Sequence, residues 1–170
     1  EYAEASALYR SFLSRDPTHQ EALIRLAESL SRSGEEEEAQ ALFSDLELRY
    51  PMWPPAMKAV AAYRWGKGDA DGAIALYEEV LRISPDDIES VVRLGEAYAS
   101  RGDFKKAVDT ASAAALRHPN DAAVQVACAN ILLWARRYDE ARGKFSEILA
   151  RWPDDAGALA GLANSYAWQG

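Results

Sequence analysis

The stretch IESVVRLGEAYASRGDFKKAVDTASAAALRHPND, residues 88–121, contains two helical patterns separated by a glycine. Apolar and small residues recur at spacings of three and four in its first half, namely Val91, Leu94, Gly95 and Tyr98. This spacing predicts a first helix with one apolar face. Gly102 suits the left-handed end of that helix, and the Asp103 side chain is expected to cap the next helix.

The second half of this stretch predicts a slim second helix that ends before a proline. Ala107, Ala111 and Ala114 recur along it, and such small side chains let two helices pack closely. Pro119 lacks an amide proton and disfavours helix at the residue before it. Residues 88–121 are therefore predicted to form a hairpin of two antiparallel helices.

The same pattern recurs along the whole chain with a period of 34 residues. Prolines mark the register at Pro17, Pro51, Pro85, Pro119 and Pro153. An alanine stands twelve residues before each proline, at Ala5, Ala39, Ala73, Ala107 and Ala141. Four of the five residues eight before the prolines are aromatic, namely Tyr9, Phe43, Tyr77 and Phe145. A fixed period of this length indicates a repeat architecture.

The length of the period and its order of apolar, small, aromatic and proline positions resemble the tetratricopeptide repeat. The resemblance implies an all-α fold, an α-solenoid of stacked antiparallel hairpins wound into a right-handed superhelix. The resemblance also implies that residues 1–170 form one domain, in which residues 20–155 contain eight helices arranged in four hairpins. The expected limits are a half-repeat at 1–19, repeats at 20–53, 54–87, 88–121 and 122–155, and a half-repeat at 156–170. We therefore expect an excerpt from a longer, bacterial repeat array.

Glycine occupies the turn between the two helices in most repeats, at Gly34, Gly68, Gly102 and Gly170. Arg136 stands at this position in repeat 122–155. Because an arginine adopts the left-handed conformation only at some cost, we expect a differently shaped turn there.

Composition and charge exclude several classes of function. The chain has 170 residues, of which 49% are hydrophobic and 27% charged, as in an ordinary folded protein with a sizeable core. Its net charge of −8 repels phosphate, so we expect no nucleic-acid partner. No apolar run approaches the roughly 18 residues of a membrane span, so we expect no membrane insertion of this segment.

No combination of residues indicates an enzyme, a cofactor or a metal site. His19 and His118 lie far apart in sequence, with no further histidine or cysteine at metal-ligand spacing. Cys128 occupies a core packing position and has no helper histidine nearby, so a nucleophile is not expected. We interpret residues 35–38, all glutamate, as a solvated first helical turn, and the pairs Asp86-Asp87 and Asp154-Asp155 as helix-starting acids after a proline turn.

The resemblance places partner-binding residues on the first helices, along a concave groove. Charged and aromatic candidates transferred by register are Arg25, Lys58, Trp65 and Arg93. One subfamily clamps the C-terminal carboxylate of heat-shock chaperones with lysine and asparagine. Here Lys58 is followed by Ala62 instead of asparagine, and Glu89 stands where a lysine is needed, so this clamp is absent.

Two pairs of residues stand out in the groove. Asn130 with Trp134, and Asn164 with Trp168, are each four residues apart and one period from their copy. This spacing puts each pair on one helix face. An amide can hold a peptide backbone or sugar hydroxyls, and an indole can stack on sugars or cations. The alternative is that both tryptophans only fill gaps between hairpins.

The leading hypothesis is therefore a non-enzymatic scaffold that binds a protein or peptide partner along the groove, within a larger assembly. The Ala-Trp-Gln-Gly ending at 167–170 and the junctions Trp53-Pro54 and Trp152-Pro153 are similar to bacterial arrays that precede outer-membrane export barrels. That resemblance implies the alternative, a periplasmic array in exopolysaccharide export that contacts glycan or export partners. A regulatory arm of an enzyme remains a third possibility. The compartment stays open, with the periplasm favoured over the cytoplasm.

Overall fold

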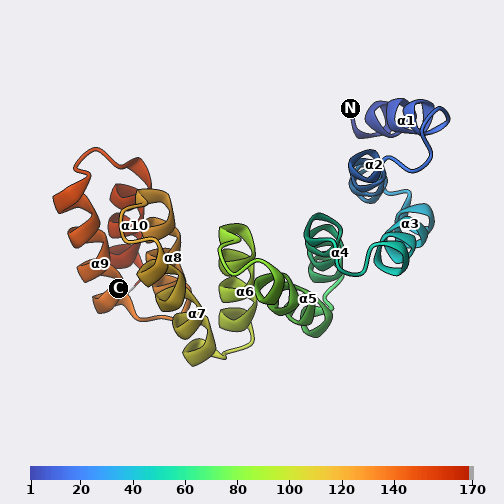
Figure 1. Cartoon of the computed structure of the whole chain (residues 1–170). Coiled ribbons are helices and arrows are strands. Elements are labelled where there is room, and N and C mark those ends of the chain that lie inside the picture. The colour runs from blue at the N-terminus through green and yellow to red at the C-terminus, as the bar shows by residue number, and fades with distance from the viewer. Residues whose placement is uncertain (169–170) are drawn as a thin grey trace. The chain divides into compact units, whose positions relative to one another are not determined.

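The structure is a computed structural model that describes residues 1–168, and these residues form ten α-helices and no strand (Figure 1). The chain divides into two compact units, Glu1–Ser84 and Pro85–Gly170. Eight of the helices fall within residues 20–155, two in each expected repeat. The prediction of an all-α fold built from helical hairpins is confirmed, while the assignment of the whole chain to a single domain stays a prediction.

The unit Glu1–Ser84 contains five helices. They are α1 (Tyr2–Leu13), α2 (Gln20–Ser33), α3 (Glu36–Arg49), α4 (Pro54–Gly66) and α5 (Ala70–Ile83). Each helix packs on the next along the chain, and the first helices α2 and α4 also pack on each other. The core includes Leu30 of α2 together with Ala39, Phe43 and Leu46 of α3, all buried.

The unit Pro85–Gly170 repeats this arrangement. Its helices are α6 (Ile88–Ser100), α7 (Phe104–Arg117), α8 (Ala122–Trp134), α9 (Tyr138–Arg151) and α10 (Ala156–Ala167). The first helices α6, α8 and α10 pack on one another in sequence, and α9 packs on both α8 and α10. One core cluster joins Ala129 and Leu132 of α8 to Phe145 and Ile148 of α9.

The predicted apolar face of residues 88–100 is confirmed. Its four members, Val91, Leu94, Gly95 and Tyr98, are all buried. Gly95 lies so close to the following first helix that an added Cβ would stand 2.6 Å from Ile131 Cδ1. The missing side chain therefore lets α6 and α8 approach each other closely.

Two of the aspartates predicted at helix starts cap their helices, and a third does not. Asp87 and Asp155 each accept a hydrogen bond from the backbone N–H three residues later, at 2.8 Å, which confirms them as capping acids. Asp103 also precedes a helix, but its side chain makes no capping hydrogen bond. Its backbone ψ of 53° departs from the extended conformation that Asp87 has at ψ 94°.

The expectation of a differently shaped turn at Arg136 is wrong. Arg136 has φ 59° and is left-handed, as are Gly34, Gly68 and Gly102 at φ 87°, 83° and 80°. The Arg137 N–H donates to the Leu132 carbonyl at 2.8 Å, which matches the bond that Asp103 donates to Tyr98 at 2.9 Å. These turn-closing bonds hold arginine in a conformation that costs a non-glycine residue about 1 kcal/mol. Gly170, the last glycine of the series, lies outside the described residues.

Within residues 1–168, no helix is long and apolar enough to cross a membrane. Nor do the described residues contain a group of histidine, cysteine and acidic side chains that could hold a metal ion.

Candidate functional site

The first helices of the unit Pro85–Gly170 carry both asparagine–tryptophan pairs. We call the surface formed by α6, α8 and α10 the first-helix face. Asn130 and Trp134 belong to α8, while Asn164 lies on α10 and Trp168 directly follows it. Asn130 and Trp134 are half-buried, and Asn164 and Trp168 are exposed. Since α8 packs on α10, the two pairs occupy equivalent positions on neighbouring helices.

The polar atoms of these pairs are available to a ligand. Among residues 1–168, neither the Asn130 nor the Asn164 side-chain amide has a hydrogen-bond partner, and neither amide is sealed from solvent. In the same part of the chain, the rings of Trp134 and Trp168 make no contact with another aromatic ring. An amide that offers both a donor and acceptors, beside an accessible indole, suits a ligand with alternating polar groups and flat faces.

Arg93 lies on the same face but is already paired. Its guanidinium Nη1 donates to Glu96 Oε2 at 3.1 Å, one helical turn later on α6. Both side chains of this pair are partly solvent-exposed, and such pairs contribute little to stability. Arg93 therefore adds charge to the face, and its pairing with Glu96 partly offsets that charge.

Arg25 occupies the same repeat position in the other unit and is held more firmly. Its guanidinium contacts Glu21 Oε1 at 2.9 Å and Glu28 Oε2 at 3.0 Å. The hydrogen bond that Arg25 donates to Glu28, together with the charge of that carboxylate, raises the pKa of Arg25 above its ordinary value. The spacing Glu-x-x-x-Arg-x-x-Glu recurs at Glu89, Arg93 and Glu96, so the sequence did contain the signal for this arrangement.

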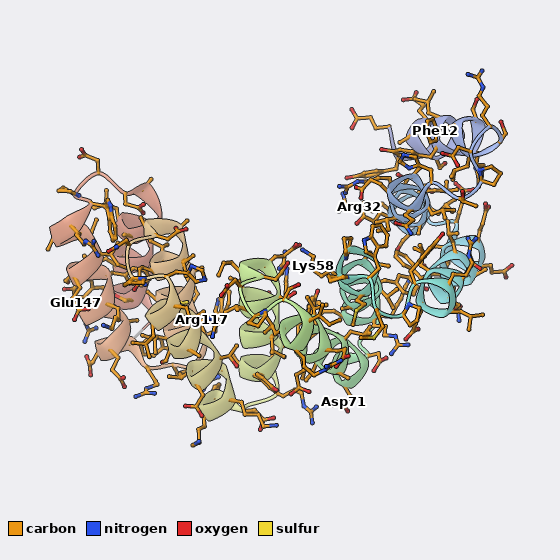
Figure 2. The ribbon with its side chains drawn as sticks, in the orientation of Figure 1. Phe12, Arg32, Lys58, Asp71, Arg117 and Glu147 are labelled. Carbon is orange, nitrogen blue, oxygen red and sulfur yellow. The ribbon has the colours of Figure 1, made fainter. Side chains whose placement is uncertain are left out.

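The two remaining candidates lie on α4. Lys58 (Figure 2) and Trp65 are both half-buried, and Lys58 interacts with another group of the protein. Arg25, Lys58 and Trp65 thus belong to the unit Glu1–Ser84, and the other five candidates to the unit Pro85–Gly170.

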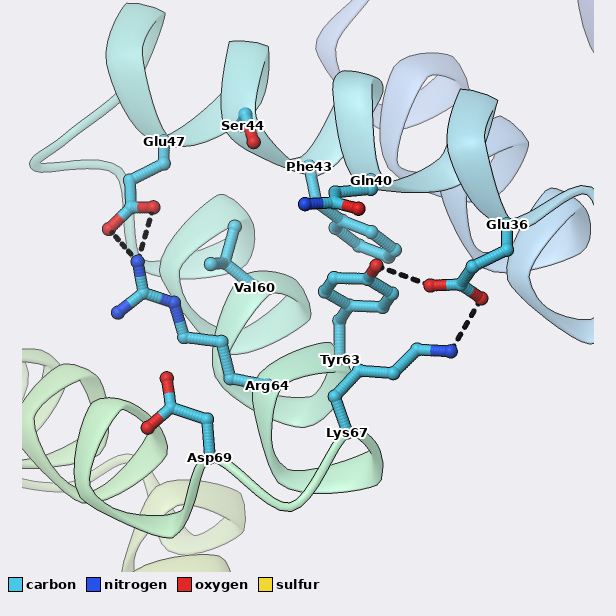
Figure 3. A pocket seen from close by; sticks show the side chains of 10 residues that line it. All are labelled: Glu36, Gln40, Phe43, Ser44, Glu47, Val60, Tyr63, Arg64, Lys67 and Asp69. Atoms are coloured by element: carbon cyan, nitrogen blue, oxygen red, sulfur yellow. Dashed lines mark hydrogen bonds and ion pairs between the residues drawn. The ribbon is translucent and has the colours of Figure 1, made fainter.

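A hollow that the sequence did not predict lies between α3 and α4, with a volume of about 430 Å³ (Figure 3). Tyr63 Oη donates to Glu36 Oε1 at 2.6 Å, and Lys67 Nζ lies 2.5 Å from Glu36 Oε2. The Tyr63 ring stacks on Phe43 with centroids 4.2 Å apart. On the other side of the hollow, Arg64 Nη2 donates to both carboxylate oxygens of Glu47, at 2.8 and 2.6 Å.

These contacts shift the pKa values of Glu36 and Tyr63 in opposite directions. Lys67 first, and then the Tyr63 hydroxyl, lower the pKa of the Glu36 carboxyl below its usual value. Burial and the neighbouring Glu36 carboxylate raise the pKa of Tyr63 to about 12. The charged groups of the hollow are therefore satisfied by one another, which favours a role in joining consecutive repeats over a role in ligand binding.

The glutamates at 35–38 stay partly exposed, as the interpretation of a solvated turn expects, but three of the four also pair with residues of other helices. Besides Glu36, Glu35 and Glu38 pair with Arg10 of α1, at 2.7 and 2.6 Å. The hydrogen bond from Arg10 lowers the pKa of Glu35. Sequence inspection missed these pairs because the partners lie 25 to 28 residues away, just short of one period.

Cys128 is buried in the core, as its position in the repeat predicts. Burial raises the pKa of its thiol to about 11. A thiol that stays protonated at neutral pH is a poor nucleophile.

Comparison with known proteins identifies the repeat. The sequence model of the tetratricopeptide repeat family matches residues 1–62 and 64–131, and a second model of the same description matches 126–170. A solved tetratricopeptide repeat protein from Parabacteroides merdae superposes with a TM-score of 0.76. The superposition covers 97% of this chain and 66% of the Parabacteroides merdae protein, at 17% sequence identity, so it supports the fold alone.

Two curated relatives are far longer than this chain. "Putative cellulose synthase operon protein C" of Escherichia coli O157:H7 is 27% identical over 167 residues, which is 95% of this chain. "Cellulose synthase 2 operon protein C" of Komagataeibacter xylinus is 30% identical over 153 residues, or 89% of this chain. The chain spans 14% and 11% of the lengths of these relatives.

Proposed function

Since the chain belongs to the tetratricopeptide repeat family, whose members are typically non-enzymatic interaction scaffolds, we propose that it binds an extended protein or peptide segment along the first-helix face. One observation carries the proposal. Two unpaired amides, Asn130 and Asn164, stand beside accessible indoles at equivalent positions of the neighbouring helices α8 and α10. Neither an enzyme activity nor a nucleic-acid partner belongs to this function.

The spacing of the two pairs suits an extended chain. Packed helices lie about 8–10 Å apart. An extended peptide advances about 3.3 Å per residue, so one amide would meet every third residue of the partner. Each amide then donates to a backbone carbonyl and accepts from a backbone N–H, while the indole covers the side chain between them.

The test is a double substitution, Asn130→Ala with Asn164→Ala. Peptides are first selected from a random display library on the immobilised chain, and the affinity of the selected peptides is then measured by calorimetry. We expect binding to weaken by about 1–3 kcal/mol in total, with no change in melting temperature, because the amides hold nothing in the free protein.

Gln40→Ala is the matched control, because Gln40 is an exposed amide on the second helix α3 and should leave affinity unchanged. A lower melting temperature with unaltered affinity, after substitution of Trp134 and Trp168, would show that the tryptophans only pack.

A polysaccharide is the second candidate ligand of the same pairs. The names of the two relatives, which refer to cellulose synthase operons, favour this candidate. Indole faces stack on sugar rings and amides bind sugar hydroxyls, so the site chemistry is compatible with a glycan in an export system. Titration with soluble cello-oligosaccharides should quench tryptophan fluorescence in the unaltered chain, and the quenching should be weaker in Trp168→Ala, which retains Trp134, and absent when both tryptophans are replaced. If the signal is flat up to the solubility limit, the glycan candidate is excluded and the peptide candidate stands.

A further inference from the structure

A largely apolar hollow of about 570 Å³ lies between the second helices α7 and α9. Its lining includes Leu116, which is 81% exposed, and the half-buried Trp152. Gln125 of α8 also lines it, and the amide of this residue donates to the backbone carbonyls of Ala115 and His118, at 2.8 and 2.9 Å. The hollow is therefore firmly held on one side and offers a large apolar side chain to solvent on another.

The repeat register shows which side chain is missing from this place. Ala115 lines the hollow on α7, whereas the same repeat position holds Glu47 in α3, Leu81 in α5 and Leu149 in α9. Each of those side chains extends several atoms beyond the methyl group of alanine. Alanine therefore leaves room between these two complete hairpins that a longer side chain takes up in the other repeats.

A guanidinium is held beside the hollow. Arg151 Nη1 donates to the Pro119 carbonyl at 2.8 Å, and Arg151 Nη2 donates to Asn120 Oδ1 at 2.6 Å. The Cζ atom of Arg151 also lies 4.6 Å from the centroid of the Trp152 ring. Among residues 1–168, none of the partners of Arg151 is a carboxylate. This arginine is thus fixed in place, and its positive charge has no acidic partner.

The same contact one repeat earlier is neutralised. Arg117 (Figure 2) donates to the Pro85 carbonyl at 2.6 Å and to Asp86 Oδ1 at 3.0 Å. Asp86 and Asn120 occupy the same repeat position, so the two arginine contacts differ by one carboxylate. The replacement of aspartate by asparagine is therefore what leaves the guanidinium beside the hollow uncompensated.

The other charges that line the hollow cancel. Lys144 Nζ lies 2.6 Å from Glu147 Oε2, so this pair adds no net charge. With Lys144 and Arg151 against Glu147, the lining has a net charge of +1 in a chain whose net charge is −8. An apolar space beside one uncompensated guanidinium suits a ligand in which an apolar side chain and a carboxylate are neighbours.

We propose that this hollow binds an acidic protein segment, with one apolar side chain of the segment in the hollow and a neighbouring carboxylate on Arg151. Contact with Leu116 and Trp152 removes the apolar side chain from water, which stabilises the complex. The carboxylate supplies to Arg151 the acid that Asp86 supplies to Arg117. The site is separate from the first-helix face and does not depend on the function proposed above, because it lies between α7 and α9.

Fluorescence polarisation with a labelled peptide, Gly-Ser-Asp-Asp-Phe-Asp-Asp-Ser-Gly, tests the proposal. We expect saturable binding that weakens as the salt concentration rises. Two matched peptides have asparagine in place of each aspartate, or serine in place of phenylalanine. Each should bind at least about tenfold more weakly, because the first lacks the charge and the second lacks the apolar side chain.

Two substitutions in the protein locate the site. Asn120→Asp gives Arg151 the carboxylate that Arg117 already has, and Ala115→Leu introduces the residue found at the same repeat position in α5 and α9. Each should weaken binding of the acidic peptide at least about tenfold, with no loss of melting temperature, because another repeat already carries the introduced residue at that position. Gln40→Glu on α3 is the matched control, since it makes the same change in net charge and should leave the affinity unaltered.

The acidic peptide should also bind the double variant Asn130→Ala with Asn164→Ala as it binds the unaltered chain, so this proposal and the proposed function fail separately. Absence of binding at protein concentrations up to about 1 mM would overturn the proposal. Equal affinities for the acidic and uncharged peptides, or an unaltered affinity in either located variant, would do the same. Binding of polygalacturonate without binding of the peptide would identify an acidic polysaccharide as the ligand and reject a protein segment.

Discussion

Leu94→Ala tests the packing of the unit Pro85–Gly170 at the centre of its predicted apolar face. Leu94 is 3% exposed on α6. The substitution removes three carbon atoms, and at about 0.8 kcal/mol for each buried carbon the lost transfer free energy is about 2.5 kcal/mol. The cavity that remains adds to this value, so we expect a total loss of about 2–5 kcal/mol in the free energy of unfolding.

The assay is thermal and urea unfolding followed by circular dichroism. A unit of this size loses about 4–8 °C in melting temperature for each kcal/mol, so the transition of this unit should fall by at least about 8 °C. Leu116→Ala removes the same atoms from a side chain that is 81% exposed on α7, and it should shift the transition by far less. Equal shifts for the two variants would refute the placement of Leu94 in the core.

Four further outcomes are expected. The Cys128 thiol, buried and with its pKa raised to about 11, should react with a thiol reagent at pH 8 at least tenfold more slowly in the folded than in the urea-unfolded chain. The folded-state pKa of Glu36 lies below its ordinary value of 4.5, so the pairing of the Glu36 carboxylate with Lys67 and Tyr63 stabilises the protein above pH 4.5. This stabilisation is lost as the pH falls through the lower, folded-state pKa. The difference in melting temperature between the unaltered chain and Glu36→Gln should therefore shrink from about pH 7 to about pH 3. Arg136→Gly should raise the free energy of unfolding by about 1 kcal/mol in urea titrations, since glycine adopts the left-handed conformation without strain. The net charge of −8 should leave no measurable binding to duplex DNA at physiological salt in a mobility-shift assay, and tight, salt-sensitive binding would contradict the exclusion of nucleic-acid partners.

The hairpins were predictable because their determinants are local. Each of the five prolines in the 34-residue register follows the end of a second helix, as Pro119 follows Arg117, and the apolar spacing around Leu94 fixes the buried face of α6. The capping acids Asp87 and Asp155 lie within three residues of the groups they bind. Interactions at this range leave a pattern that can be read along the sequence.

The contacts that the sequence did not predict have partners elsewhere in the chain. Nothing beside Glu36 indicates Tyr63 or Lys67, which come from the next repeat, and nothing beside Glu35 indicates Arg10. The conformation of Arg136 was also mispredicted, because residue preference was weighed without the hydrogen bond from Arg137 to Leu132. The choice between packing and binding for Trp134 and Trp168 depends on a ligand, so it stays a prediction.

The packing of each helix on its neighbours along the chain has a consequence for biosynthesis. In both units the contacting helices are adjacent or next-but-one in sequence, so few contacts await residues that are made much later. Chains with such a low contact order fold rapidly and close only short loops. A ribosome that adds roughly 5–20 residues each second would release one 34-residue hairpin within several seconds, long enough for it to settle on the preceding hairpin before the next emerges. Apolar helix faces are then exposed one at a time during synthesis, which limits the opportunity for nascent chains to aggregate.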